Sequence, residues 1–194
     1  MWSESAPPPP IWVVAILVAL VVAAAVTDLR RGLVPNWLTL PGIGLALLAH
    51  TVAGWAAGGP GLFGSAWAGT DRLLGLSGSL YGLAAGFLPL LVFWLAGGMG
   101  GGDAKLMGAI GAWAGWRLAL DVMLLGVAVA AVMAIVVMVR KRVVRRTLRR
   151  VWDAVLLVLL RVKPADPTSA DSPKIPFALA LCLGTLLALG TLWL

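Results

Sequence analysis

The stretch Gly97-Gly98-Met99-Gly100-Gly101-Gly102-Asp103-Ala104-Lys105 lies between two apolar runs and places one carboxylate directly after a glycine-rich segment. Charged side chains at membrane depth are costly in free energy and by default mark a functional site. Five of the six residues from Gly97 to Gly102 are glycine, so the backbone can leave the helical conformation and approach an extended substrate closely. This stretch therefore predicts a helix boundary that carries a functional aspartate.

The composition is that of an integral membrane protein. Of the 194 residues, 61% are hydrophobic and only 12% are charged, and the mean hydropathy is +0.98. Such a chain has too little polar surface to cover a water-soluble globule. A membrane-spanning helix needs about 20 apolar residues, so this length allows about six transmembrane helices. We therefore expect an all-α fold, a polytopic membrane helical bundle, with residues 1–194 forming a single domain.

The expected helices follow from the apolar runs and the breaks between them. They cover approximately residues 11–27, 37–57, 80–96, 104–116, 122–139 and 176–194. The segment 58–78 is rich in glycine and proline and is expected to form a loop that can include a short interfacial helix. Residues 1–10 carry four consecutive prolines and no basic residue, and are expected to form a disordered tail. Residues 140–174 are expected to form a basic amphipathic segment that binds membrane lipid headgroups at the cytoplasmic interface.

The distribution of basic residues predicts how the bundle is oriented. If Asp28 faces the cytoplasm, 13 of the 15 Lys and Arg residues lie on that side, and only Arg72 and Arg117 lie outside. This bias follows the positive-inside rule and predicts both termini outside. It also brings Asp28, Asp103 and the start of the last helix to one face of the membrane. Because the positive-inside rule accounts for the distribution of the basic residues, the net charge of +7 does not indicate nucleic acid as a partner.

Asp28 and Asp103 are the candidate catalytic residues. Among the eight acidic residues, only these two and Asp121 lie near helix ends outside long polar loops, and Asp121 falls on the outer side. A peptide bond is hydrolysed when one carboxylate takes a proton from water while a carboxylic acid donates a proton to the carbonyl oxygen. Two close carboxyl groups share one proton and can fill both roles. The alternative for each aspartate is a helix cap or terminator at the membrane boundary.

No cofactor and no metal site is expected. Cys182 is the only cysteine and His50 the only histidine, so the sequence offers no cluster of ligands for zinc. His50 lies toward the outer side of the second expected helix, far from both candidate aspartates. We expect it to make an interhelical hydrogen bond.

Four segments of the chain together resemble the type IV prepilin peptidases, the GxGD class of membrane aspartic proteases. The segments are Asp28–Arg31 (DLRR), Val34–Thr39 (VPNWLT), Gly98–Leu106 (GMGGGDAKL) and Lys174–Ala180 (KIPFALA). The resemblance extends from the first expected helix to the last. It implies that Asp28 and Asp103 are the catalytic pair. It also implies cleavage of the short basic leader peptide of prepilins or pseudopilins, typically after a glycine, at the cytoplasmic face of a prokaryotic inner membrane.

The remaining candidate residues lie in the same segments. Those expected to act as hinge or substrate-binding positions are Gly100, Gly101, Gly102, Lys105, Pro35 and Asn36. For Lys105, snorkelling of the ammonium group to the cytoplasmic interface is favoured over direct contact with substrate. The four-cysteine loop of the long bifunctional members is absent between the first two expected helices, so methylation is not predicted. This short form resembles the peptidases of tight-adherence (Flp) pilus systems, and archaeal preflagellin peptidases share the motifs.

Two other kinds of function remain open. A non-enzymatic membrane subunit or a proton- or cation-coupled transporter would use the aspartates as an ion site, although the sequence shows no internal duplication of the kind common in transporters. A presenilin-like protease usually carries a tyrosine before its first aspartate, where this chain has Thr27. The oligomeric state does not follow from the sequence.

Overall fold

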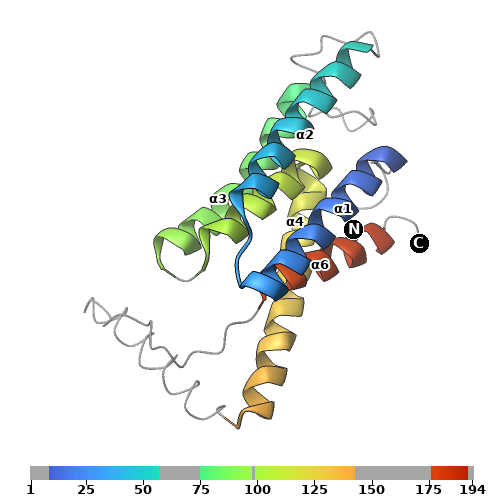
Figure 1. Ribbon diagram of the computed structural model, residues 1–194. Helices are drawn as coiled ribbons and strands as arrows, with labels where there is room; N and C mark the ends of the chain where they lie inside the picture. Colours follow the sequence, from blue (N-terminus) through green and yellow to red (C-terminus); the bar gives the residue numbers. More distant parts are fainter. Residues whose placement is uncertain (1–8, 57–74, 98, 143–175, 192–194) are drawn as a thin grey trace. The chain divides into compact units, whose positions relative to one another are not determined.

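The computed structural model describes residues 9–56, 75–97, 99–142 and 176–191, and the regular elements in these ranges are all α-helices. They are α1 (Ile11–Arg31), α2 (Asn36–Ala56), α3 (Gly75–Leu95), α4 (Gly101–Arg140) and α6 (Phe177–Thr191) (Figure 1). Helices α1 to α4 are long and apolar enough to cross a membrane, and α6 is a shorter apolar helix. The expected all-α membrane bundle is confirmed. The tail at residues 1–8 and the basic segment from residue 143 to 174 lie outside the described residues.

The chain divides into two compact units, which are described separately. The first unit comprises residues 1–129 and 176–194, and the second comprises residues 130–175. Helices α1, α2, α3 and α6 and most of α4 belong to the first unit. The described part of the second unit is the end of α4 and the turn that follows it. All the candidate site residues lie in the first unit.

Helix α1 ends at a glycine whose backbone only glycine adopts easily. Gly32 has a φ of 65° and a ψ of 25°, and its N–H donates to the carbonyl oxygen of Asp28 at 2.7 Å. This left-handed residue closes the last turn of α1. After a short connection, the Pro35 carbonyl accepts from the N–H of Leu38 at 3.2 Å and so begins α2. The connection between α1 and α2 therefore spans only four residues.

Helix α4 is two helices joined at Gly115. This residue has a φ of 78° and a ψ of 169°, which interrupts the helix inside α4. The sequence predicted that one helix ends around Trp116, or at Leu120 if it is to span the membrane, and that the next begins near Val122. The break instead lies one residue before Trp116, since a left-handed φ favours glycine. When α4 is counted as two helices, the described residues form six helices, as expected.

Glycines let α3 and the first part of α4 touch through their backbones. A Cβ atom at Gly82 would overlap the carbonyl oxygen of Gly111, and one at Gly86 would overlap the carbonyl oxygen of Met107. The paired positions rise in α3 as they fall in α4, so these two helices are antiparallel. The Ser79 hydroxyl donates to the Ala112 carbonyl at 2.7 Å within the same contact. The predicted start of α3 was wrong, because residues 75–78, which were assigned to the preceding loop, are helical, and Gly75 and Gly78 are buried.

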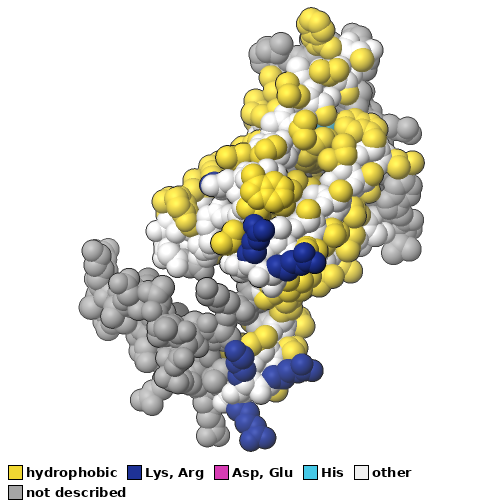
Figure 2. Space-filling view, in the orientation of Figure 1, with side chains coloured by type: hydrophobic (Ala, Val, Ile, Leu, Met, Phe, Trp, Pro, Cys, Tyr) yellow, Lys and Arg dark blue, Asp and Glu magenta, His cyan; other side chains and the backbone are white. Residues whose placement is uncertain are grey.

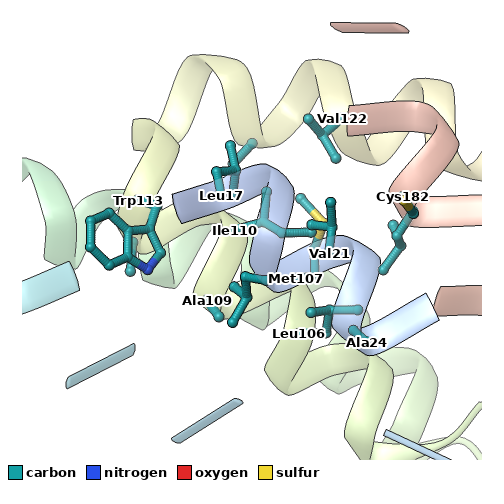
Figure 3. Packing of buried hydrophobic residues seen from close by; sticks show 14 of the residues in the cluster. Leu17, Val21, Ala24, Leu106, Met107, Ala109, Ile110, Trp113, Val122 and Cys182 are labelled. Atoms are coloured by element: carbon teal, nitrogen blue, oxygen red, sulfur yellow. The ribbon is translucent and has the colours of Figure 1, made fainter. Parts of the chain in front are cut away.

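The apolar core is built around α1 and the first part of α4. Figure 3 shows side chains of α1 packed beside those of α4, and these are Leu17, Val21, Ala24, Leu106, Met107 and Ile110. Other apolar side chains point outward, including Trp37, Leu48 and Val92. In Figure 2, hydrophobic side chains cover much of the visible face. An apolar exterior of this kind suits lipid contact, because lipid is as apolar as the side chains themselves.

The histidine lies at the end of the bundle away from the candidate aspartates. Nε2 of His50 in α2 is 3.2 Å from the Trp113 carbonyl oxygen of α4, and the His50 side chain is only 1% exposed. Its ring also lies near the rings of Trp12 and Trp113, at centroid distances of 6.0 and 5.9 Å and in tilted arrangements. The predicted interhelical hydrogen bond is therefore confirmed.

Candidate active site

Asp28 lies in the last full turn of α1 and faces the start of α6. Its side chain is only 9% exposed. One carboxylate oxygen, Oδ2, accepts a hydrogen bond from the backbone N–H of Ala178 at 3.0 Å. Ala178 is the second residue of α6, where backbone N–H groups have no partner within their own helix. The last helix therefore fixes the orientation of the Asp28 carboxylate.

Asp103 lies in the first turn of α4, directly after the glycine-rich segment. Its N–H donates to the Gly100 carbonyl at 3.2 Å, and its side chain is half-buried. The end of α1 and the start of α4 come together here, because the connection that follows α1 contacts Gly102 through the Val34 carbonyl. Residues 75 positions apart in the sequence therefore lie at one end of the bundle. Two carboxyl groups held close together would share a single proton.

The glycines before Asp103 allow other parts of the chain to approach closely. A Cβ atom at Gly102 would lie 2.8 Å from the carbonyl oxygen of Val34, in the connection between α1 and α2. A Cβ atom at Gly101 would lie 3.0 Å from Nε1 of Trp94, near the end of α3. At Gly100 the nearest atom would be Oδ2 of Asp103 itself, at 3.3 Å. Side chains at these positions would displace the groups around Asp103.

Lys105 and Asn36 make direct contact beside the two aspartates. Nζ of Lys105 donates a hydrogen bond to Oδ1 of Asn36 at 2.9 Å. Asn36 is the first residue of α2, and its side chain is exposed. Pro35, the residue before it, contributes the carbonyl group that begins α2. Thus Lys105, Asn36 and Pro35 gather where α1, α2 and α4 meet.

The structure brings the predicted site residues to one end of the bundle, and it adds partners that the sequence did not indicate. The resemblance drew attention to the segment from Lys174 to Ala180 but did not reveal that a backbone N–H within it would reach Asp28. Val34 and Trp94 were also missed as neighbours of the glycine hinge. Within the described ranges, no group of three or more His, Cys, Asp or Glu side chains could hold a metal ion.

The fold and this site define a polytopic helical membrane protein with two aspartates at one end of the bundle. The model of the type IV leader peptidase family matches residues 15–135, and the chain belongs to that family. Membership of a peptidase family does not favour the alternative of a transporter or a non-enzymatic subunit.

Similar curated proteins are each named prepilin leader peptidase/N-methyltransferase. They include proteins from Pseudomonas aeruginosa, 32% identical over 123 residues, Aeromonas hydrophila, 34% identical over 127 residues, and Xanthomonas campestris pv. campestris, 35% identical over 126 residues. The matched regions cover 60% to 62% of this chain but only 36% to 38% of these relatives. The chain therefore spans little more than a third of their length. No solved structure matches the chain.

Proposed function

We propose that this protein is a membrane aspartic endopeptidase that removes the basic leader peptide from prepilin or pseudopilin substrates at the cytoplasmic membrane face. The observation that carries the proposal is the meeting of the end of α1, which carries Asp28, with the start of α4, which carries Asp103, where the Val34 carbonyl approaches Gly102. Membership of the type IV leader peptidase family supports the same activity. The names of the similar curated proteins give the class of substrate.

In the proposed reaction, Asp28 and Asp103 together hold one proton and one water molecule. The unprotonated carboxyl group takes a proton from water while the protonated one donates its proton to the carbonyl oxygen of the scissile peptide. The resulting tetrahedral diol then expels the amine, which takes a proton from one aspartate while a hydroxyl of the diol returns its proton to the other, so the pair again holds one proton. Oδ2 of Asp28 already accepts the Ala178 N–H, so we assign Oδ1 to the exchanged proton. No cofactor enters this reaction.

The glycines before Asp103 are proposed to receive the substrate. Gly100, Gly101 and Gly102 form the hinge, since a backbone without side chains leaves room for an extended peptide. The whole chain, residues 1–194, is assigned to one peptidase domain. We place it in the prokaryotic inner membrane with both termini outside, because this orientation puts the aspartates on the side where most of the basic residues lie.

Coexpression with a prepilin would test this function directly. We expect Asp28→Asn and Asp103→Asn each to reduce leader cleavage by at least about 100-fold, since acid and base groups commonly contribute that much. Asp121→Asn is the matched control, because it makes the same change at an exposed aspartate in the second part of α4. All three variants should accumulate equally in the membrane.

The result that refutes the proposal is continued cleavage by either catalytic-site variant. Proton-dependent solute flux in proteoliposomes, without any cleavage of a prepilin, would favour the transporter alternative instead.

A further inference from the structure

The hydrogen bond between Lys105 and Asn36 links two segments of the chain that are far apart in the sequence. The two residues are 69 positions apart, and the distance from Nζ to Oδ1 is 2.9 Å. An ammonium group near an interface can satisfy its donors with water, so the site does not need this bond to accommodate the charge. The bond does, however, join the start of α2 to the first turns of α4.

The same two segments also touch at a second point. Val34 lies two residues before Asn36, and its carbonyl oxygen would be 2.8 Å from a Cβ atom at Gly102. Gly102 in turn lies three residues before Lys105. One contact alone would let the two segments pivot about it. Two contacts fix the orientation of one segment relative to the other.

Both aspartates lie next to these two contacts along the backbone. Asp103 lies between Gly102 and Lys105 in the sequence, so the two contacts flank it. The Asp28 carbonyl accepts the N–H of Gly32 at 2.7 Å, which joins the end of α1 to the connection that carries Val34. A shift of this connection would therefore change the separation of the two carboxyl groups.

A direct contact between Lys105 and the leader peptide agrees less well with the charges. The proposed leader is basic, and an ammonium group repels other cations. Arg30 and Arg31, at the exposed end of α1, already place positive charge near the site. A hydrogen bond to the neutral amide of Asn36 gives Lys105 a role that does not depend on attraction to the substrate.

We infer that Lys105 and Asn36 are a positioning pair, whose hydrogen bond holds the α1–α2 connection against the glycine hinge and keeps Asp103 beside Asp28. The inference rests on the proposed endopeptidase function. Neither residue acts on the peptide bond itself, and both act through the placement of Asp103. Misplacement of reacting groups by about 1 Å can cost up to about 100-fold in rate, so loss of this bond should lower kcat rather than raise KM.

The test compares Asn36→Ala, Lys105→Met and the double variant in cleavage of a purified prepilin. Each single variant should lower kcat by about tenfold with little change in KM, and the double variant should fall no further, because both changes remove the same bond. Asn36→Asp and Lys105→Arg keep a donor facing an acceptor and should retain at least about half of kcat. Arg31→Met is the matched control and should leave kcat unchanged, because it removes an exposed positive charge without breaking this bond.

Four outcomes would overturn the inference. Loss of cleavage in Lys105→Met but not in Asn36→Ala would place Lys105 on the substrate. Effects of the two single variants that multiply in the double variant would show that the two residues act independently, and a rise in KM without a fall in kcat would show a role in substrate binding. The fourth outcome is a normal kcat in both single variants. Asp28→Asn and Asp103→Asn belong in the same assay. If these two variants still cleave, the proposed function fails, whereas normal kcat in Asn36→Ala and Lys105→Met alongside inactive aspartate variants refutes only the positioning role.

Discussion

The backbone contact between α3 and α4 predicts a large effect of adding one methyl group at Gly82. A Cβ atom there would overlap the Gly111 carbonyl oxygen, and it would lie 2.8 Å from the carbonyl carbon of Gly111 and 2.9 Å from Cα of Gly115. Carbon atoms in contact normally lie about 3.5–4.0 Å apart, so the two helices would have to separate by roughly 1 Å. The obstructing atoms all belong to the backbone and cannot rotate away as a flexible side chain would.

We therefore expect Gly82→Ala to lower the free energy of unfolding by roughly 2 kcal/mol, within the range of about 1–3 kcal/mol usual for overpacking. Gly44→Ala in α2 is the matched control, because a Cβ atom at Gly44 would meet no other atom within 4 Å. That change should not lower the free energy of unfolding, and the higher helix propensity of alanine should raise it by up to about 1 kcal/mol.

Titration of the purified protein from mild detergent into SDS, followed by circular dichroism and tryptophan fluorescence, would give the free energy of unfolding for each variant. Gly82→Ala should unfold at a clearly lower SDS fraction than the wild type and Gly44→Ala. If Gly82→Ala unfolds with the wild type, the close approach of α3 and α4 is wrong. If Gly44→Ala loses as much stability as Gly82→Ala, the cost does not come from this contact.

Three further predictions concern the end of α1, His50 and metal ions. Gly32→Ala should lower the free energy of unfolding by about 1–2 kcal/mol in the same titration, because its φ of 65° is unfavourable for alanine. A Cβ atom there would meet no neighbour within 4 Å, so the cost is conformational and not steric. Gly32→Asn should cost less because asparagine adopts this conformation more readily, and equal losses in the two variants would contradict this explanation. His50→Leu should cost about 1–3 kcal/mol by leaving the Trp113 carbonyl unpaired, yet cleavage per folded molecule should stay unchanged because His50 lies at the other end of the bundle. Leader cleavage should also be insensitive to EDTA, and activity that is lost on chelation and restored by a divalent metal would show a metal requirement.

The helices, and the location of the two aspartates at one end of the bundle, could be predicted from the sequence because each follows from a simple pattern. An apolar run such as residues 11–27 has the length that a bilayer requires, and it ends beside Asp28. The alternation of runs and the distribution of basic residues then place Asp28 and Asp103 at the same membrane face. Hydropathy and charge are sufficient for this step because the bilayer restricts the chain to a few possible arrangements.

The position of the breaks could not be predicted in the same way. Gly115 interrupts α4 although it lies in an apolar run, and the small residues at the start of α3 are helical although they resemble a loop. A glycine has the same appearance in a sequence whether it bends the backbone or lets another helix approach. Which role it takes depends on the neighbour that packs against it, and that neighbour is far away in the sequence.

The partners of the site residues were unpredictable for a related reason. Helical periodicity indicates that Lys105 and Asp103, two residues apart, point to different faces, but it does not say what each face meets. The acceptor of Lys105 is Asn36, and the donor to Asp28 is a backbone N–H of Ala178. Both contacts depend on how α2 and α6 are placed against α1 and α4, so only the three-dimensional structure reveals them.

The glycines of α3 and α4 connect the packing of the bundle to the geometry of the site. Gly82 meets Gly111, Gly86 meets the Met107 carbonyl, and nearer the site Trp94 meets Gly101. The two glycine contacts share one antiparallel register, because a step of four residues up α3 matches a step of four residues down α4. The same two helices also bring the Trp94 side chain to Gly101, two residues before Asp103. The helices that hold the bundle together through glycine contacts therefore also supply the surroundings of the hinge.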